Sequence, residues 1–466
     1  MPNRPIPFLV WLAKLPLLWL GHELLLARLR FEARREKGDA TRTPRVVASA
    51  SWTFPVYSQT FVHHEVMAMA RAGFHLRFLY GRLGPRGDLA DTCGGLWKLK
   101  QRVLLHAATG ALDLARFHRR MPDRVEGLVQ QVAAAAGISR EALLRNEHFL
   151  QAFSFARAVE ACGADYLHSY FFYEQTLYTL VASQLLHIPR GVSCYSDHML
   201  SDYPLKLTRL HLQTCDVIVA TSRRIRAELE SLHGASLPQI MVKPNAIDTS
   251  AFRVKSAWAP AVGGPLRLLC VCRIDPKKGI EYLIEAVALL RESGVPAELD
   301  IVGASDSHSE ESLNYEAALR SRAASLHVAG TIRFAGQRTS REVREYLDRA
   351  DIFVAPYVDL PNGDKDGIPT AILEAMAAGS VIVTTDAGSI REVVDDGRQG
   401  LIVPQRDPAS LAAAVERIKG DEDLARRLSA GAAFRARTEY NIGESEGTFH
   451  ERVRSAVEAP HRPRST

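Results

Sequence analysis

Short apolar runs rich in β-branched residues alternate with longer helical stretches along this chain, and the alternation starts at residue 45. It is typical of parallel sheets wrapped by helices, because parallel strands need long crossover connections. The first series of expected strands covers 45–51, 75–80, 165–170, 191–196, 216–222 and 239–243. The second covers 266–273, 298–303, 332–336, 352–356, 381–385 and 400–403. The sequence therefore predicts an α/β fold with two Rossmann-like, doubly wound parallel sheets.

A segment rich in proline, glycine and alanine separates the two series at 257–265, and we expect a linker there. Residues 98–160 are expected to be mostly helical, without a strand of comparable quality. The predicted units are a helical extension at 1–44, a first domain at 45–255, a second at 265–430, and a helical segment at 431–466 that partly crosses back to the first domain. Ligands bind at the carboxyl ends of the strands in such sheets, so we expect a site in the cleft between the domains.

Composition excludes several classes of protein. With 466 residues, 47% hydrophobic and 24% charged, the chain is an ordinary globular protein. A net charge of +5 without a zinc finger or an aromatic-basic motif gives no reason to expect nucleic acid as a partner. The six cysteines are sparse for a secreted scaffold and lack zinc-site spacing, which favours the cytoplasm. Cys270 and Cys272 lie in an apolar run and are expected to be buried thiols.

The N-terminal extension leaves three interpretations open. Residues 8–29 are strongly apolar but are interrupted by Lys14, Pro16, His22, Glu23 and Arg28. No small-residue cleavage site follows, so a signal peptide is not expected. Trp11, Trp19 and the arginines after them suit a helix lying in the plane of a membrane surface. The alternatives are an extra helix packed on the protein and a transmembrane span, which needs about twenty mostly uncharged residues.

Two clusters of basic residues allow two interpretations, namely a solvated face or attraction to an anionic membrane or a lipid-phosphate acceptor. The clusters are Arg28, Arg30, Arg34, Arg35, Lys37, Arg42 and Arg45, followed later by Arg116, Arg119, Arg120 and Arg124.

The stretch at 366–379 reads DGIPTAILEAMAAG and places two carboxylates, Asp366 and Glu374, around an expected helix start. Pro369 suits the first position of that helix. Free backbone amides at a helix start attract phosphate, and a carboxylate accepts hydrogen bonds from two vicinal sugar hydroxyls. The expected ligand-binding residues around the helix start are Gly367, Ile368, Pro369, Thr370 and Glu374.

Two cations, Arg273 and Lys278, follow the first strand of the second series. Arginine offers a planar fork and lysine a point charge, and both suit a diphosphate. Negative charge builds on a departing phosphate during group transfer, so fixed cations there stabilise the transition state. Without other evidence, ordinary surface charge is the alternative.

Together these stretches resemble the retaining glycosyltransferases of family four, which have the two-domain GT-B fold. The resemblance covers much of the chain after residue 45 and is densest at 266–404. The paired acidic motif of the family, E-x7-E, is present as Asp366 and Glu374, with aspartate in the first place. The resemblance implies that Asp366 contacts the donor sugar and Glu374 the ribose hydroxyls. It also implies that Arg273 and Lys278 bind the diphosphate.

The first domain resembles the family more distantly. The loop at 54–61 is similar to a loop of exopolysaccharide- and lipopolysaccharide-type members, with Gln59 in the place of a glutamate. Tyr195 stands where the family often has a histidine near the donor sugar, and His198 lies three residues later. His198 is therefore a catalytic candidate, and a structural histidine is the alternative. The acceptor-side candidates are Ser58, Gln59, Thr60, Tyr195, Asp197 and His198.

The resemblance implies an enzyme that transfers a hexosyl-type sugar from a nucleotide-diphosphate sugar with retention of the anomeric configuration. In this mechanism the acceptor hydroxyl approaches from the face that the nucleotide leaves, and a phosphate oxygen takes its proton. No metal and no other cofactor is expected. The expected acceptor is a glycan or lipid-linked saccharide of cell-surface polysaccharide synthesis, and the expected location is the cytoplasm, peripheral on the inner face of the membrane.

Two alternatives stay open at this point. One keeps the fold and changes the reaction to that of a sugar phosphorylase, a disaccharide-forming synthase or a nucleotide-sugar epimerase. The other is a non-catalytic, membrane-associated protein that binds nucleotide sugars. A nicotinamide dehydrogenase is disfavoured, because no Gly-x-Gly-x-x-Gly follows the strand at 45 or at 266.

Overall fold

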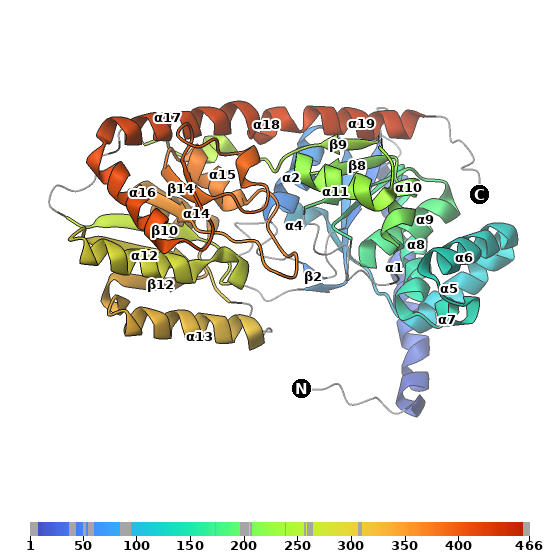
Figure 1. Cartoon of the computed structure of the whole chain (residues 1–466). Coiled ribbons are helices and arrows are strands. Elements are labelled where there is room, and N and C mark those ends of the chain that lie inside the picture. Colours follow the sequence, from blue (N-terminus) through green and yellow to red (C-terminus); the bar gives the residue numbers. More distant parts are fainter. Residues whose placement is uncertain are drawn as a thin grey trace.

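The structure is a computed structural model with two parallel sheets lying side by side below a run of C-terminal helices (Figure 1). It describes residues 8–36, 43–49, 53–54, 60–83, 95–172, 174–195, 205, 207–237, 239–255, 258, 264–305 and 310–459. The α/β fold with two Rossmann-like domains predicted from the alternating pattern is confirmed.

The first sheet has seven parallel strands in the described part of the chain, in the order β5-β3-β1-β6-β7-β8-β9. Their bounds are β1 Arg45–Ser49, β3 His75–Tyr80, β5 Lys100–Arg102, β6 Tyr166–Tyr170, β7 Arg190–Cys194, β8 Val217–Ala220 and β9 Ile240–Val242. A small separate pair is formed by β2 Thr53–Phe54 and β4 Arg82–Leu83. The edge strand β5 lies in the region that we expected to be mostly helical. Its three polar residues give no strand pattern, and pairing with β3 alone forms it.

The second sheet has the strand order β12-β11-β10-β13-β14-β15, and all its pairs are parallel. Their bounds are β10 Leu266–Val271, β11 Ala297–Val302, β12 Ile332–Gly336, β13 Ile352–Ala355, β14 Val381–Thr385 and β15 Leu401–Val403. The order reverses between β10 and β13. Connections leave these two strands toward opposite sides, and ligands bind at the carboxyl ends of the strands at such a switch point in doubly wound sheets; we call this region the crevice.

Helices cover both sheets. Those of the first domain are α2 Thr60–Arg71, α4 Leu96–Leu99, α5 Ala107–Arg120, α6 Pro122–Ala136, α7 Arg140–Leu144, α8 Glu147–Cys162, α9 Glu174–Leu186, α10 Thr208–Thr214 and α11 Arg223–His233. Those after β10 are α12 Ile280–Glu292, α13 Glu310–Ser325, α14 Ser340–Arg349, α15 Thr370–Ala377, α16 Pro408–Gly420, α17 Glu422–Glu439, α18 Ile442–Ser445 and α19 Gly447–Glu458. Side chains cap several of their starts, as in the reciprocal capping box of Thr339 and Glu342 at α14.

Each sheet has its own apolar core. One cluster fills the second domain, and two others fill the opposite faces of the first sheet. Cys270 and Cys272 are buried as expected, with sulfurs 3.7 Å apart on the same side of β10.

The N-terminal helix α1, Phe8–Glu36, packs against α5 and α8. Two of the residues that interrupt its apolar run point into the protein. His22 Nε2 lies 3.0 Å from Asp113 Oδ2, and Arg157 Nη1 lies 2.9 Å from Glu23 Oε1 and 2.7 Å from Asp113 Oδ1. Charges of opposite sign compensate one another in this buried cluster, so they fix the helix on the domain. In the described part of the chain no helix is long and apolar enough to cross a membrane.

The C-terminal helices run from the second domain back over the first (Figure 1), where α19 packs against β6 and β8. A buried lysine holds this contact. Lys243 Nζ lies 2.5 Å from Glu65 Oε2 and 2.7 Å from Glu446 Oε1, just before α19. Burial raises the pKa of Glu446 to about 7; the charge of Lys243 lowers it and that of Glu65 raises it. The lysine thus joins three segments that are distant in sequence.

Replacing Lys243 by methionine should lower the free energy of unfolding by about 3–5 kcal/mol, because two buried carboxylates lose their shared cation. Thermal unfolding followed by circular dichroism measures the loss. Lys419→Met, at an exposed position of α16, is the control and should leave the transition unchanged. An equally stable Lys243→Met variant would show that the cluster does not hold α19 in place.

Candidate functional site

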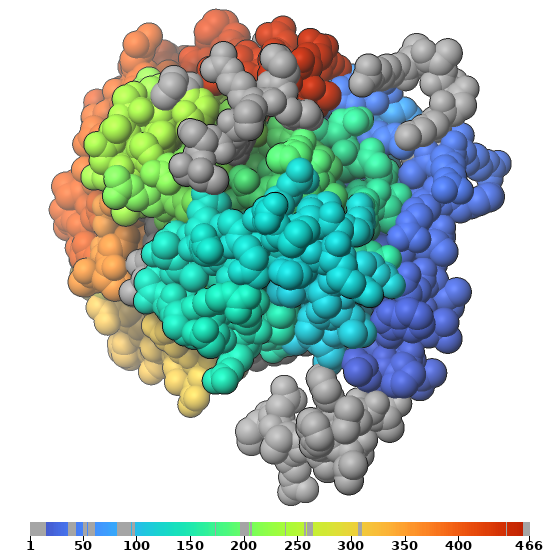
Figure 2. Space-filling view, turned by 90° about the vertical axis from the view of Figure 1, so that its right-hand side faces the viewer, coloured from blue at the N-terminus to red at the C-terminus, as the bar shows by residue number. Residues whose placement is uncertain are grey.

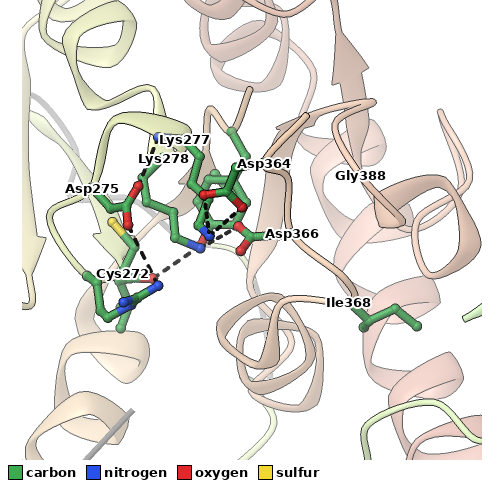
Figure 3. A network of polar contacts seen from close by, with 12 residues as sticks. Cys272, Asp275, Lys277, Lys278, Asp364, Asp366, Ile368 and Gly388 are labelled. Atoms are coloured by element: carbon green, nitrogen blue, oxygen red, sulfur yellow. Dashed lines mark hydrogen bonds and ion pairs between the residues drawn. The ribbon is translucent and has the colours of Figure 1, made fainter. Parts of the chain in front are cut away.

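Two loops meet at the crevice of the second sheet. The first follows β10 and runs through Arg273 to a short 3-10 helix, Pro276–Lys278. The second follows β13 and leads to α15. Because β10 and β13 are neighbours, the loops bring their charged side chains together (Figure 3). Lys278 Nζ lies 2.5 Å from Asp366 Oδ2, and Lys277 Nζ lies 3.0 Å from Asp364 Oδ1.

Two glycines allow this close approach. Gly279 has φ +59°, and a Cβ atom there would lie 2.1 Å from the carbonyl oxygen of Pro356. Gly388 has φ +57°, and a Cβ atom there would lie 2.0 Å from the carbonyl oxygen of Asp366. A side chain at Gly279 would push the loops after β10 and β13 apart, and one at Gly388 would push the loop after β14 away from Asp366. L-residues also rarely adopt this backbone conformation.

Asp366 is held as a carboxylate. Burial by itself would raise its pKa, but the charges of Lys278 and Lys277, the hydrogen bond from Lys278 and the charge of Arg273 outweigh burial and lower it. Lys278 also lies over the ring of Tyr357, 4.1 Å from its centroid. This contact adds a cation–π attraction that keeps the ammonium group in place.

Glu374 differs from Asp366. Its side chain keeps partial contact with solvent, and its carboxylate has no hydrogen-bond or ion-pair partner within the described ranges. Burial raises its pKa to about 7, and the charge of Arg344 opposes this only in part. Buried polar groups normally find partners, so an unpaired carboxylate in a crevice is a marker of a ligand site.

Arg273 completes the set. Its side chain is 53% exposed, and its guanidinium lies 3.7 Å from Asp275. Its charge contributes to lowering the pKa of Asp366, and the charges of Asp366 and Glu374 both help burial to raise the pKa of Tyr357. Arg273, Lys278, Asp366 and Glu374 therefore lie around one crevice.

The residues between the two carboxylates face the first domain. A Cβ atom at Gly367 would lie 2.5 Å from the carbonyl oxygen of Tyr195, and Asn245 Nδ2 donates to the carbonyl oxygen of Ile368 at 3.0 Å. Helix α15 begins at Thr370, one residue later than expected, and Pro369 is its cap residue with ψ 122°. The loop at 366–369 therefore lies between the two domains.

Several candidates of the first domain fall outside the described residues, namely Ser58, Gln59, Asp197 and His198. Thr60 opens α2, and its side chain is likewise outside them. The hydroxyl of Tyr195 donates to Glu65 Oε2 at 3.1 Å, and its ring lies 4.4 Å from that of Phe61. The side chain of Tyr195 thus points into the first domain, and only its backbone faces Gly367.

Lys277, Asp364 and Tyr357 belong to the site but were not among the residues predicted from the sequence. Asp364 and Asp366 have the Asp-x-Asp spacing that can hold a metal-bound diphosphate, and the sequence shows this spacing directly. Each carboxylate is paired with a lysine here. In the part of the chain that the structure describes, no group of three or more histidine, cysteine, aspartate or glutamate residues is placed to hold a metal ion. The contact of Lys278 with Tyr357 has no sequence signal, because 79 positions separate the two residues.

Two family models match the chain. The model described as Glycosyltransferase Family 4 matches residues 58–251, and the model described as Glycosyl transferases group 1 matches residues 265–421. The chain belongs to glycosyltransferase family four. In this glycosyltransferase, the group 1 match contains both loops of the crevice.

Solved structures and relatives in sequence agree with this membership. Sucrose-phosphate synthase from Thermosynechococcus elongatus superposes with a TM-score of 0.64 at 19% identity, covering 88% of this chain and 100% of that structure. HepE of Anabaena in complex with UDP has a TM-score of 0.64 at 15% identity, covering 89% and 100%. These likenesses show the GT-B fold.

By sequence, the amylovoran biosynthesis glycosyltransferase AmsK of Erwinia amylovora is 27% identical over 83% of this chain and 94% of its own length. A putative colanic acid biosynthesis glycosyltransferase, WcaL of Escherichia coli, is 27% identical over 79% of this chain and 90% of its own length.

The raised pKa of Glu374 predicts a stability effect of known sign. In the folded protein Glu374 keeps its proton up to about pH 7, whereas in the unfolded chain it releases the proton near the ordinary pKa of 4.5. The folded state therefore binds more protons between these values, and Glu374 makes the protein less stable as the pH rises through them. Glu374→Gln mimics the protonated form. It should raise the free energy of unfolding on the order of 1 kcal/mol at about pH 8 and leave it unchanged at about pH 5.

Thermal unfolding at the two pH values measures this difference. Glu451→Gln, at an exposed position of α19, is the control and should show no pH-dependent gain. Equal stability of Glu374→Gln and the unsubstituted protein at high pH would contradict the raised pKa.

Proposed function

We propose that this protein transfers a sugar from a nucleotide-diphosphate sugar, bound in the crevice between β10 and β13, to an acceptor with retention of the anomeric configuration. The observation that carries the proposal is that an exposed cation and an unpartnered carboxylate lie at the same crevice. Arg273 is 53% exposed, and Glu374 has no partner in the described part of the chain. A ligand with a diphosphate at one end and vicinal hydroxyls at the other satisfies both groups.

The donor diphosphate would bind to Arg273 and Lys278. The ammonium of Lys278 has three donors and uses one for Asp366, so two remain for phosphate oxygens. Glu374 would accept hydrogen bonds from the ribose hydroxyls, and Asp366 would accept from the transferred sugar. The lysines paired with Asp364 and Asp366 supply positive charge beside the leaving group without a metal ion.

In the reaction, the bond between the anomeric carbon and the phosphate oxygen breaks as the acceptor oxygen bonds to the same face of that carbon. The acceptor hydroxyl passes its proton to an oxygen of the departing phosphate, and the nucleoside diphosphate leaves. Charge builds on that phosphate, so the fixed cations stabilise the transition state more than the ground state. The protein contributes positioning and electrostatic stabilisation and needs no nucleophile of its own.

Alanine variants of the donor site test the proposal. Lys278→Ala and Glu374→Ala should each lower sugar release from the accepted nucleotide sugar by about a hundredfold, because each removes a charged contact that acts in the transition state. A panel of uridine, guanosine and adenosine diphosphate sugars identifies the donor. Lys419→Ala, at the exposed end of α16, is the control. Unchanged turnover in both site variants would falsify the assignment.

The same assay separates the alternative reactions. Nuclear magnetic resonance of the product reports its anomeric configuration, and an inverted product would contradict retention. Sugar release that requires inorganic phosphate would instead indicate a phosphorylase. Isomerisation of the donor sugar without transfer would indicate an epimerase. Binding of the donor without any turnover would indicate a non-catalytic protein.

The names of the relatives AmsK and WcaL place them in amylovoran and colanic acid biosynthesis. We infer that this chain likewise acts in exopolysaccharide synthesis, on a lipid-linked saccharide at the inner face of the cell membrane. The exposed face of α1 supports this location. Large apolar side chains, which we call the α1 stripe, recur there at helical spacing opposite the buried face of the helix. The α1 stripe consists of Leu17, Leu20, Leu24 and Phe31, with exposed fractions of 71%, 49%, 63% and 68%.

Basic residues extend the α1 stripe toward the C-terminal end of the helix. Arg28, Arg30, Arg34 and Arg35 are all exposed there. The helix lies along one flank of the molecule, beside the helices coloured cyan in Figure 2. An apolar face followed by arginines suits the interface of an anionic membrane. The later cluster offers less free charge, because Arg116 and Arg120 form ion pairs with Glu23 and Glu160.

Flotation with lipid vesicles tests this surface. The protein should float with vesicles containing phosphatidylglycerol. A Leu20→Glu, Leu24→Glu double variant should float at least about tenfold less, because two apolar side chains that would enter the membrane become charged. Leu313→Glu, a comparably exposed leucine of α13, is the control and should float as the unsubstituted protein does. Equal vesicle binding by the α1 double variant and the unsubstituted protein would show that another surface contacts the membrane.

A further inference from the structure

The start of α11, in the first domain, contacts the second domain beside the proposed donor site. The backbone N–H groups of Arg223 and Arg224 donate to the two carboxylate oxygens of Glu392, at 2.8 and 3.0 Å. Ser389 Oγ donates to Ser222 Oγ at 2.9 Å. A carboxylate of one domain thus caps a helix of the other, where the free amides and the helix dipole favour negative charge.

The side chain of Arg224 reaches further into the site. Its Nε donates to Ser389 Oγ at 3.0 Å, and its Nη2 donates to the carbonyl oxygen of Asp366 at 3.1 Å. Its Nη1 donates to Glu228 Oε1 at 2.9 Å, one turn along the same helix. The guanidinium thus contacts Glu228 on its own helix and reaches both the loop after β14, at Ser389, and the loop after β13, at Asp366.

The loop at Asp366 is confined from two sides. The backbone of Gly388 approaches so closely that a Cβ atom there would lie 2.0 Å from the carbonyl oxygen of Asp366. Arg224 binds the same carbonyl oxygen from the side of the first domain. The contact with Gly388 stays within the second domain, but the contact with Arg224 exists only while the domains are closed. Closure of the domains thus adds a contact to the backbone of Asp366, whose carboxylate is bound by Lys278 within the second domain.

We propose that Arg224 is a positioning residue that couples closure of the two domains to the placement of Asp366 against the transferred sugar. This inference rests on the proposed function, because it assigns the sugar contact to Asp366. Arg273, Lys278 and Glu374, the proposed nucleotide contacts, lie in the second domain and do not touch Arg224 through any described hydrogen bond. Loss of Arg224 therefore affects transfer of the sugar and spares binding of the nucleotide.

This separation gives a test that a merely structural role would not pass. Arg224→Ala should lower kcat by about tenfold to a hundredfold, the loss expected for charge-assisted hydrogen bonds to a positioned group. The affinity for the nucleoside diphosphate should change less than about twofold, which calorimetry measures. Arg224→Lys keeps the charge and one hydrogen bond, so it should restore part of kcat.

The matched control is Arg226→Ala. Arg226 lies on the same helix and pairs with Glu230 within α11, so its loss should leave kcat unchanged. Ser389→Ala is a second variant in the event that Arg224→Ala unfolds, and it should lower kcat in the same direction without changing nucleotide affinity. The pair of variants should be non-additive, because both groups share one hydrogen bond.

Small-angle scattering of the nucleotide-bound protein gives an independent readout of closure. Arg224→Ala should be more extended than the Arg226→Ala control. An Arg224→Ala variant with normal kcat, or one that loses nucleotide affinity as strongly as kcat, would overturn the inference. Failure of the unsubstituted protein to transfer any sugar would instead refute the proposed function, while the scattering comparison would still report on the closure contact.

Discussion

The contact between Lys278 and Asp366 is the interaction on which the site depends. It joins the loop after β10 to the loop after β13, which are 88 residues apart in sequence. The two charges are largely shielded from water, so each needs the other to offset the cost of desolvation. Tyr357 below the ammonium and the close approach at Gly279 fix the geometry. The second pair, Lys277 with Asp364, joins the same two loops from the side.

The ion pair of Lys278 and Asp366 leaves Arg273 and Glu374 available for a ligand. One crevice can therefore bind both a diphosphate and sugar hydroxyls. Asp366 and Lys278 are held in place, whereas Arg273 stays half exposed and Glu374 stays unpartnered in the described structure. Keeping Glu374 unpaired costs stability, as its raised pKa indicates. Costs of this kind gather at functional sites, because the ligand, and not the fold, satisfies the group.

Sequence patterns were sufficient for the sheets and for the charged segments. The apolar runs of β10 and β13 and the spacing of Asp366 and Glu374 are local features, so they predicted two domains and a shared site. Contacts between distant segments left no such signal. The edge strand β5 is polar and exists through pairing with β3, and Arg224 resembles any surface arginine of an amphipathic helix. His22 and Glu23 looked like interruptions of a membrane helix, although they face Asp113 and Arg157 inside the protein.

Calorimetric titration with nucleoside diphosphates shows whether the crevice binds a nucleotide, on which any transfer of sugar depends. Uridine, guanosine and adenosine diphosphates are titrated into the protein and into Lys278→Met and Arg273→Met variants. We expect one-to-one binding of one of these nucleotides, weakened at least about tenfold in both variants. Variants that bind the nucleotide as tightly as the unsubstituted protein, or a protein that binds none of the three, would contradict the account.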